Sequence, residues 1–309
     1  MLVLLLYLSF SKVVHSSYHI RDNSLVPPYS GPHWVPYGST IIEPQFVRLT
    51  SDVKSNQGGI FNIKPLFARD WEVVILFHVH SPKTLVGDGF AFWYTQHPPS
   101  SGPAFGSRDK FRGLAVFFDT YANQNGEHSH EHPYVSAMIN DGSKHYDHDK
   151  DGTLTELSGC SSNFRNNDYS MATIRYANNQ LKVSLKYQGA TDPVDCFTVD
   201  GVRLPTGYFI GISAATGDLS DNHDVYSIHT YELDVGRKVS LLCTNIYSPY
   251  PTFLSLHIYI YIYIYIYIYI YIYIYISETK YHISYIIFCS FSIIVFLISR
   301  FSDEFSGKI

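Results

Sequence analysis

Oxygen-bearing groups gather in one short segment, directly after the apolar run Leu114–Phe118. Asp119 offers a carboxylate there, Tyr121 a backbone carbonyl and Asn123 a side-chain amide oxygen. A second segment, Asp147–Gly152, adds further carboxylates and a histidine. Ca²⁺ takes about six to eight oxygen ligands at flexible geometry, so these hard oxygen donors suit that ion. The two segments therefore predict a calcium site.

An EF-hand is a second calcium interpretation, because Asp147-x-Asp-x-Asp-Gly152 resembles the opening of such a loop. An EF-hand requires a bidentate Glu at the last position of its loop, and Ser158 stands there. Amphipathic helices should also flank the loop, and neither side shows helical periodicity. The sequence therefore argues against an EF-hand.

Three histidines at alternate positions, His128, His130 and His132, could suggest a zinc site. They stand beside Glu127 and Glu131 in a polar segment between two expected strands. We interpret this segment as the exposed polar tip of a loop, because clusters of polar residues between periodic runs are typical of loops.

The elements that position these segments are expected to be strands. β-Branched and aromatic runs recur along the chain, with turn residues between them. The runs cover residues 45–49, 71–80, 89–95, 114–118, 133–139, 171–176, 180–187, 196–199, 208–213 and 225–233. No window shows convincing helical periodicity. The pattern predicts an all-β fold, an antiparallel β-sandwich or jelly roll.

Two of these runs have a clear orientation. Residues 171–176 and 180–187 alternate apolar and polar side chains, so each strand should have one wet face. The Ala-Asn-Asn sequence that separates them is a hairpin signal.

The composition limits the classes of partner. Among 309 residues, 22 Lys and Arg face 27 Asp and Glu, which gives a net charge of −5. The basic residues form no cluster and no arginine-rich arm, so nothing favours a nucleic-acid partner. Hydrophobic residues make up 46% of the chain, enough for one large domain or two small ones.

The first residues indicate the compartment. Met1–Phe10 is an apolar run too short to span a bilayer, and small polar residues follow it, so residues 1–17 read as a secretory signal peptide. The mature chain would then meet an oxidising lumen, where disulfides form. Cys160 and Cys196 lie in the globular part, and a bond between them is the economical prediction. The alternative is two buried free thiols.

Residues 236–309 form an atypical low-complexity tail. Ile258–Ile276 alternates Ile and Tyr strictly, a pattern that a translated AT repeat would produce. Val239 and the next residue are what a GTAAGT splice donor encodes, so we hypothesise intron read-through from that point. Residues 283–299 are apolar and nearly long enough to span a membrane, which makes a membrane segment the alternative reading.

Residues 22–235 resemble the L-type, legume-lectin-like domain of animal cargo lectins. Four stretches in order carry the resemblance: Gly87–Tyr94, Gly113–Tyr121, Tyr146–Gly152 and Gly207–Asp224. The resemblance implies a non-enzymatic, calcium-dependent lectin that binds high-mannose N-glycans on cargo glycoproteins. It further implies membrane anchoring and transport between the endoplasmic reticulum and the Golgi, with the lectin domain in the lumen.

The resemblance also assigns the metal ligands. It implies that Asp119, the carbonyl of Tyr121, Asn123 and Asp151 hold Ca²⁺. Plant members hold a second, transition-metal ion with a Glu two residues before the Asp. Phe117 stands at that place, so we predict no such second site.

The sugar contacts follow from the same resemblance. They are Asp88, Asn123, His148, Gly217, Asp218 and Leu219. Carboxylates can accept from the vicinal hydroxyls of mannose, while amide and backbone N–H groups donate. Family mannose binders carry a Ser contact where Gly59 stands here, and the loss of that hydroxyl should weaken binding or shift the linkage preference. His148 suggests pH-dependent release, because an imidazole titrates near the pH of secretory compartments.

Two rival functions are possible on the same scaffold. A glycoside hydrolase needs paired carboxylates, but the candidate acids here are better used as metal ligands. No expected strand carries two inward Glu residues at alternate positions. A non-sugar adhesion module is the other rival.

Overall fold

The computed structural model describes residues 17–123, 130–187 and 189–233, together with Tyr267. The chain divides into two compact units, Met1–Lys238 and Val239–Ile309. The second unit lies almost entirely outside the described residues, and so do the Ile-Tyr repeat, the expected membrane segment and residues 1–16. Within the described ranges, no helix has the length and apolar character needed to cross a membrane.

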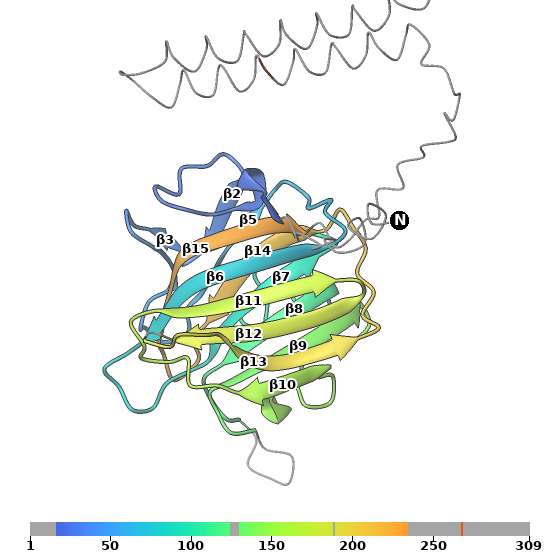
Figure 1. Ribbon diagram of the computed structural model, residues 1–309. Coiled ribbons are helices and arrows are strands. Elements are labelled where there is room, and N and C mark those ends of the chain that lie inside the picture. Colours follow the sequence, from blue (N-terminus) through green and yellow to red (C-terminus); the bar gives the residue numbers. More distant parts are fainter. Residues whose placement is uncertain (1–16, 124–129, 188, 234–266, 268–309) are drawn as a thin grey trace, which may run out of the picture. The chain divides into compact units, whose positions relative to one another are not determined.

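The described strands form two antiparallel sheets, which Figure 1 shows with their labels. The larger sheet runs in the order β13 (Val194–Asp200), β12 (Gln180–Tyr187), β11 (Ser170–Ala177), β6 (Trp71–His80), β15 (Asn222–Leu233), β4 (Val47–Thr50) and β3 (Ile41–Ile42), with β1 (Ser17–His19) paired to β15. The smaller sheet runs in the order β10 (Ser158–Ser161), β9 (Tyr134–Asp141), β8 (Arg112–Asp119), β7 (Gly89–Thr95), β14 (Phe209–Ala215), β5 (Gln57–Asn62) and β2 (Trp34–Gly38). Two short 3-10 helices, η1 (Arg21–Asn23) and η2 (His148–Lys150), complete the described elements. The predicted antiparallel β-sandwich is confirmed.

The core lies between the two sheets. Strand β6 buries every second residue, beginning with Trp71 and including Phe77. These side chains meet aromatic residues of the other sheet, since Phe77 packs edge-on against Phe90 and Phe118, with ring centroids 4.8 and 5.5 Å apart. Burial of one such side chain contributes roughly 1.5–3 kcal/mol. The alternating pattern therefore fixes which face of β6 points inward.

The predicted hairpin joins β11 to β12. Ala177 pairs with Gln180, and the two residues between them have positive φ, 53° at Asn178 and 61° at Asn179. Asparagine tolerates this left-handed region well, and two such residues match the right-handed twist of the strands. β11 alternates buried and half-buried side chains, as predicted, whereas β12 also buries Ser184 and so departs from the predicted alternation.

A disulfide joins Cys160 of β10 to Cys196 of β13, with their Cα atoms 5.4 Å apart. Each strand lies at one edge of its own sheet, so the bond links the two sheets along one side of the sandwich. The predicted pairing is therefore present. Closing a loop of 36 residues stabilises the fold by about 4 kcal/mol on the chain-entropy model.

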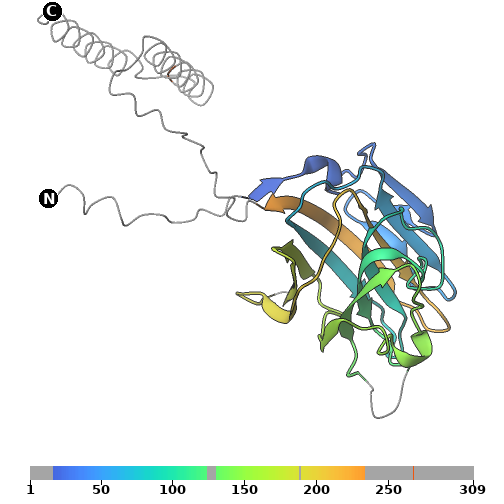
Figure 2. The ribbon, with the colours of Figure 1, turned by 90° about the vertical axis from the view of Figure 1, so that its right-hand side faces the viewer.

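Some strands were not expected from the sequence. The missed strands are β1, β2, β3, β5 and β10. Pro36 in β2, Gly58 and Gly59 in β5 and Gly159 in β10 are poor strand formers, and pairing with neighbours overrides that preference. Figure 2 shows the first strand, in blue, beside the end of the orange β15, so the sheet already includes residues upstream of position 22.

Candidate functional site

The register of three strands brings the candidate residues to one rim. Gly89, the first residue of β7, pairs with Asp119 at the end of β8 and with Ala215 at the end of β14. Asp88 precedes β7, its N–H donates to Ala215 O at 3.2 Å, and its carbonyl accepts from Thr120 N at 2.9 Å. The segments that follow β8 and β14 therefore lie on either side of Asp88.

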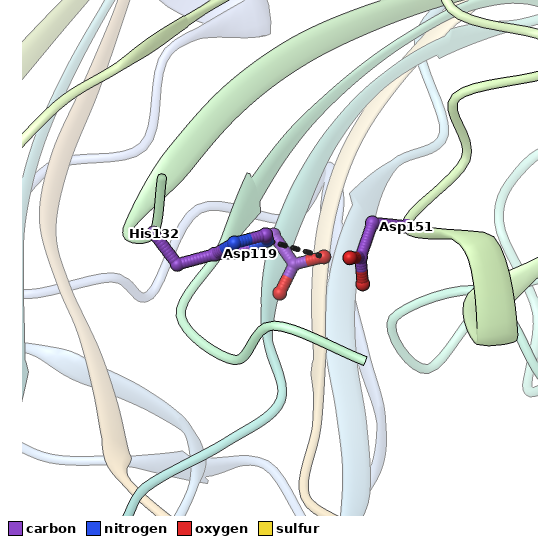
Figure 3. A group of neighbouring side chains, drawn as sticks. All are labelled: Asp119, His132 and Asp151. Atoms are coloured by element: carbon purple, nitrogen blue, oxygen red, sulfur yellow. Dashed lines mark ion pairs between the residues drawn. The ribbon is translucent and has the colours of Figure 1, made fainter. Parts of the chain in front are cut away.

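Two buried carboxylates face each other at this rim. Asp119 is 5% exposed and Asp151 is 3% exposed. One ligand atom from each of these residues and one from His132 all lie within 4.8 Å of one another, and Figure 3 shows the three side chains together. Burial raises the pKa of Asp119, and the negative charge of Asp151 raises it further, against the lowering effect of His132. A dication between the carboxylates would remove this repulsion, so the donor set fits Ca²⁺.

The segment after β8 curls around these acids. Asp119 Oδ1 accepts from the N–H of Tyr121 at 3.0 Å, and Asp151 Oδ1 accepts from the N–H of Asn123 at 2.9 Å. Asn123 itself is exposed. Asn123 thus lies at the surface and next to Asp151. This place suits the two roles that the resemblance implies for Asn123, a calcium ligand and a sugar contact.

The second segment delivers one acid to the cluster. Asp151 follows η2 as its C-cap in the left-handed region, with φ 48°, and its N–H donates to His148 O at 3.0 Å. Gly152 follows with φ 68°, and a Cβ there would lie 2.3 Å from the Tyr146 ring, so only glycine fits. Asp147 pairs with Lys150 at 3.6 Å instead of joining Asp151.

The EF-hand interpretation fails on the surrounding elements. Ser158, at the position of the bidentate ligand, begins β10, and β9 precedes the loop where a helix would be needed. Asp149 is exposed and lies outside the three-residue cluster. The second segment therefore supplies fewer carboxylates than its sequence suggests.

His148 is held in a fixed orientation beside the acids. Its Nε2 lies 2.7 Å from Pro103 O, so Nε2 donates, because a carbonyl oxygen only accepts. The imidazole packs against Phe105 and Tyr146, with ring centroids 5.2 and 4.7 Å apart. It lies near enough to Asp88 to lower the pKa of that carboxyl.

Asp88 forms the centre of the expected sugar contacts. Burial raises its pKa to about 6, with further raising by Asp119 and Asp218, while His148 and the backbone N–H of Gly217 oppose the rise. A Cβ added at Gly87 would lie 3.4 Å from Cβ of Leu219. The six sugar-contact positions predicted from the sequence therefore share one rim, around the Asp119–Asp151 pair.

Gly59, which stands where family mannose binders carry a Ser, lies against the Tyr37 side chain. A Cβ at Gly59 would lie 2.6 Å from the hydroxyl oxygen of Tyr37, its partner across β2 and β5. That hydroxyl donates to Gly106 O at 3.2 Å. The Tyr37 ring therefore occupies the space that a serine side chain would need.

The interpretation of the histidine segment as an exposed loop tip is wrong for two of its members. The His130 side chain is 15% exposed, its Nε2 lies 3.0 Å from Glu156 Oε2, and its ring stacks on Tyr134. The His132 side chain is only 6% exposed and faces Asp119. His128 lies outside the described residues. The histidine spacing was visible in the sequence, but its proximity to Asp119 depends on the register of β8 and β9.

A network of charges anchors the segment that follows β14, and the sequence did not reveal it. Asp221 is fully buried and accepts from Arg165 Nη2 at 2.9 Å. Next to it, Ser220 Oγ donates to Asp52 Oδ1 at 2.6 Å, and Lys83 Nζ pairs with the same oxygen at 2.6 Å. These contacts hold the residues directly after the expected sugar-contact turn.

The fold and this rim together define a class of protein, an antiparallel β-sandwich with an acidic cation site next to a polar binding surface. A family model described as the legume-like lectin family matches residues 16–239, and the chain belongs to this family. The resemblance to L-type lectins is thereby confirmed. This is a family of lectins and not of enzymes.

Named relatives are similar over the same part of the chain. Vesicular integral-membrane protein VIP36 of Mus musculus is 46% identical over 226 residues, 70% of this chain and 63% of that protein. The VIP36-like protein of Homo sapiens is 45% identical over 226 residues, 70% of this chain and 65% of that protein. The chain thus spans less than two thirds of the length of these relatives. A crystal structure of the exoplasmic/lumenal domain of VIP36 in its Ca²⁺/Man2-bound form is 46% identical, with a TM-score of 0.68, and covers 71% of this chain and 90% of that one.

Proposed function

We propose that this chain is a calcium-dependent lectin that binds high-mannose N-glycans of cargo glycoproteins and sorts them between the endoplasmic reticulum and the Golgi. The observation that carries the proposal is the convergence of Asp119 and Asp151 with Asp88 at one rim. The Ca²⁺/Man2-bound form of VIP36, a relative of this chain, supports both the ion and the sugar class.

The metal would be held by Asp119, the carbonyl of Tyr121, Asn123 and Asp151. When bound, Ca²⁺ supplies charge neutralisation for two buried carboxylates and stiffens the segment that carries Asn123. The hydrogen bond from the Asn123 N–H to Asp151 already joins the two ligand-bearing segments. This hydrogen bond brings Asn123 next to Asp151, and bound Ca²⁺ would complete the preorganisation of Asn123 for the sugar.

The sugar would be recognised by groups on four segments. Asp88 accepts from hydroxyl groups as a carboxylate, and Asn123 donates from its amide. The backbone N–H groups of Gly217–Leu219 donate to sugar oxygens. The hydrogen bond that Nε2 of His148 donates to Pro103 O leaves Nδ1 of the same ring for the sugar. Tyr121, which is 38% exposed, offers an aromatic surface to the apolar face of a sugar ring.

Isothermal titration of the protein with an oligomannose sugar tests the proposal. Binding is expected in calcium and should be lost in chelator. Asp88→Asn should weaken sugar binding while calcium binding persists, because Asp88 faces the sugar and not the ion. Equal affinity in calcium and in chelator would contradict the proposal, and recovery of shortened sugars would favour a glycoside hydrolase.

The compartment and the tail belong to the same proposal. We propose the lumen of the ER–Golgi intermediate compartment and Golgi membranes as the site of action. The names 'vesicular integral-membrane protein' and 'exoplasmic/lumenal domain' of the relative VIP36 support the coarser statement, a membrane of the secretory pathway. For the tail, sequencing of transcripts across the codons of Lys238 and Val239 separates the two hypotheses. If all mature transcripts continue from the Lys238 codon into the Ile-Tyr codons, the intron read-through hypothesis is contradicted. A membrane anchor within residues 283–299 is then favoured.

A further inference from the structure

A cavity lies at the end of β7 that is remote from the candidate calcium and sugar residues. Its volume is about 270 Å³, and its lining includes Thr95, the last residue of β7, and Arg112, the first of β8. Strands β7, β8 and β9 lie side by side in the smaller sheet (Figure 1). β7 has 7 residues at about 3.3 Å each, so roughly 20 Å separate the cavity from the rim that carries Asp88. The cavity therefore uses none of the residues of the proposed sugar site.

The cationic side chains of this lining have no acidic partner. Arg108, Lys110 and Arg112 all line the cavity, and all three residues are exposed. Among the residues that the structure describes, none of the three takes part in an ion pair. The chain as a whole carries a net charge of −5, so this group of cations runs against its overall balance. Like charges around one cavity repel each other unless an anion lies between them.

The acids nearest to these cations are engaged elsewhere. Asp109, which stands next to Arg108, pairs with Nδ1 of His145. Of the described residues that line the cavity, Asp141 alone carries a carboxylate. Its Oδ1 accepts from the N–H of Ser143 at 3.0 Å and from the hydroxyl of the same residue at 2.5 Å. The positive charge of the lining therefore remains available to a ligand.

One hydrogen bond holds each of the two arginines and leaves its terminal nitrogens available. Nε of Arg108 donates to Ser100 Oγ at 2.7 Å, and Nε of Arg112 donates to Asp141 O at 3.1 Å. In the described part of the chain, neither guanidinium donates to a further acceptor. Each guanidinium is thus fixed at one nitrogen and presents two terminal NH₂ groups. A planar pair of donors of this kind matches two oxygens of a phosphate.

The apolar part of the lining is well packed. It consists of Trp93, Pro98, Pro99 and Phe111. Trp93 and Phe111 are buried and pack edge-on, with ring centroids 5.1 Å apart. A Cβ on Gly211 would lie 2.7 Å from Pro99 Cγ, so Pro99 packs directly on β14. Ligand sites combine such walls with a few polar groups, and drug-sized ligands occupy about 300–1,000 Å³, so this cavity suits a smaller molecule.

We propose that this cavity binds a small phosphate monoester, with the phosphate between Arg108 and Arg112 and the organic group against Phe111 and Pro98. A phosphate has three terminal oxygens, so it can accept from both guanidinium groups and from Lys110 at once. A phosphate monoester loses its second proton near pH 6, so it is largely a dianion at pH 7 and balances the charge of the lining. The site requires neither calcium nor sugar and goes beyond the proposed function.

Isothermal titration of the full chain with phenyl phosphate, and separately with inorganic phosphate, tests the proposal. Chelator keeps the calcium site empty and prevents precipitation of calcium phosphate. The wild type should bind phenyl phosphate with a Kd of about 1 mM or tighter, and more tightly than inorganic phosphate, because the apolar wall adds contacts. Arg108→Gln and Arg112→Gln should each weaken the binding of phenyl phosphate about tenfold.

Two further variants separate a specific site from general charge attraction. Arg69→Gln is the matched control, because Arg69 is exposed, lies outside the lining and loses the same charge, so it should bind phenyl phosphate like the wild type. Asp141→Asn removes the carboxylate from the lining and should tighten binding about threefold, an effect of opposite sign. Circular dichroism verifies that each variant is folded.

The outcomes also separate this inference from the proposed function. A wild type that shows no saturable binding of phenyl phosphate overturns the inference, and so do equal losses in Arg69→Gln and Arg112→Gln. Equal affinity for phenyl phosphate and inorganic phosphate overturns the assignment of a monoester. If oligomannose fails to bind in calcium, but phenyl phosphate binds in a manner that depends on Arg108 and Arg112, the proposed function fails and the inference stands.

Discussion

Both carboxylate oxygens of Asp88 lie 3.2 Å from the position that a Cβ atom on Gly217 would occupy. The Asp88 carboxylate therefore packs directly against Gly217, and the absence of a side chain at Gly217 leaves room for it. Since the backbone N–H of Gly217 also acts on that carboxylate, the two residues form one recognition unit at the rim.

Gly217→Ala is therefore expected to weaken oligomannose binding about tenfold, or about 1.4 kcal/mol, because the methyl group displaces the Asp88 carboxylate. Calcium affinity should change little, since Asp119 and Asp151 keep their positions. Titration calorimetry with sugar and with Ca²⁺ measures both. Gly31→Ala is the control, because a Cβ at Gly31 meets nothing within 4 Å. Equal losses of sugar and calcium affinity would contradict this account.

Asp119→Asn should abolish stabilisation by calcium. A ligand at 100 times its Kd stabilises a folded protein by about 2.7 kcal/mol. The wild type should show a corresponding rise in Tm on adding Ca²⁺, and the variant should show almost none. Thermal unfolding with and without Ca²⁺ measures the difference. A calcium-dependent rise in the variant equal to that in the wild type would remove Asp119 from the site.

Arg165→Met should destabilise the fold and weaken sugar binding together. It leaves the carboxylate of Asp221 buried without its ion-pair partner, which costs about 3–5 kcal/mol. The sugar-contact turn then loses an anchor only a few residues away. Arg175→Met is the matched control, because the Arg175–Glu72 pair is partly exposed, at 35% and 24%, and such pairs contribute about 1 kcal/mol or less.

A double variant tests the cause of the Arg165 effect. Arg165→Met combined with Asp221→Asn removes the buried charge as well as its partner, so part of the stability should return. Urea unfolding of the wild type, the two single variants and the double variant gives the coupling energy. Simple additivity of the two single effects would show that the ion pair does not anchor the turn.

His223 should make the fold sensitive to acid. Burial lowers its pKa to about 3, and its Nδ1 shares a hydrogen bond with Thr50 Oγ1 at 2.7 Å. The folded state keeps this imidazole neutral, while the unfolded state takes up a proton below a pKa near 6.5. Stability is therefore fully present above pH 6.5 and is lost as the pH falls toward 3. Between pH 7 and pH 5 the loss is about 2 kcal/mol.

The measurement compares the pH dependence of two proteins. The free energy of unfolding is determined at pH 7 and at pH 5 for the wild type and for His223→Gln. The fall between the two pH values should be about 2 kcal/mol smaller in the variant, whatever its absolute stability. An identical fall in both proteins would show that His223 is protonated in the folded state.

Replacing both Cys160 and Cys196 with Ser should lower the free energy of unfolding by about 2–5 kcal/mol. The disulfide links edge strands of the two sheets, so its loss also frees β10 and β13 at that side. Sugar affinity should be retained, because the candidate rim residues are held by other contacts. Unfolding in denaturant, with and without reductant, measures the effect. A wild type unaffected by reductant and equal in stability to the double variant would contradict it.

Most strands were predictable because their side-chain pattern is local. The predicted boundaries of 71–80, 89–95 and 180–187 match β6, β7 and β12. Residues 71–80 and 89–95 are β-branched or aromatic runs and 180–187 alternates apolar and polar residues, and both features can be recognised without knowledge of the neighbouring strands. β5 was missed because Gly58 and Gly59 carry no side chain that could form such a pattern, and β14 and β2 hold it in place.

The sequence by itself determined the sandwich class, the hairpin at Asn178, the candidate disulfide and the oxygen donors at Asp119 and Asp151. Each of these is a property of residue type or short-range spacing. Only the tertiary structure decided that His132 faces Asp119, that Tyr37 occupies the space beside Gly59, and that Arg165 holds Asp221. The physical reason is strand register: which residues of distant strands meet depends on pairing across the sheet, and no local pattern in the chain records it.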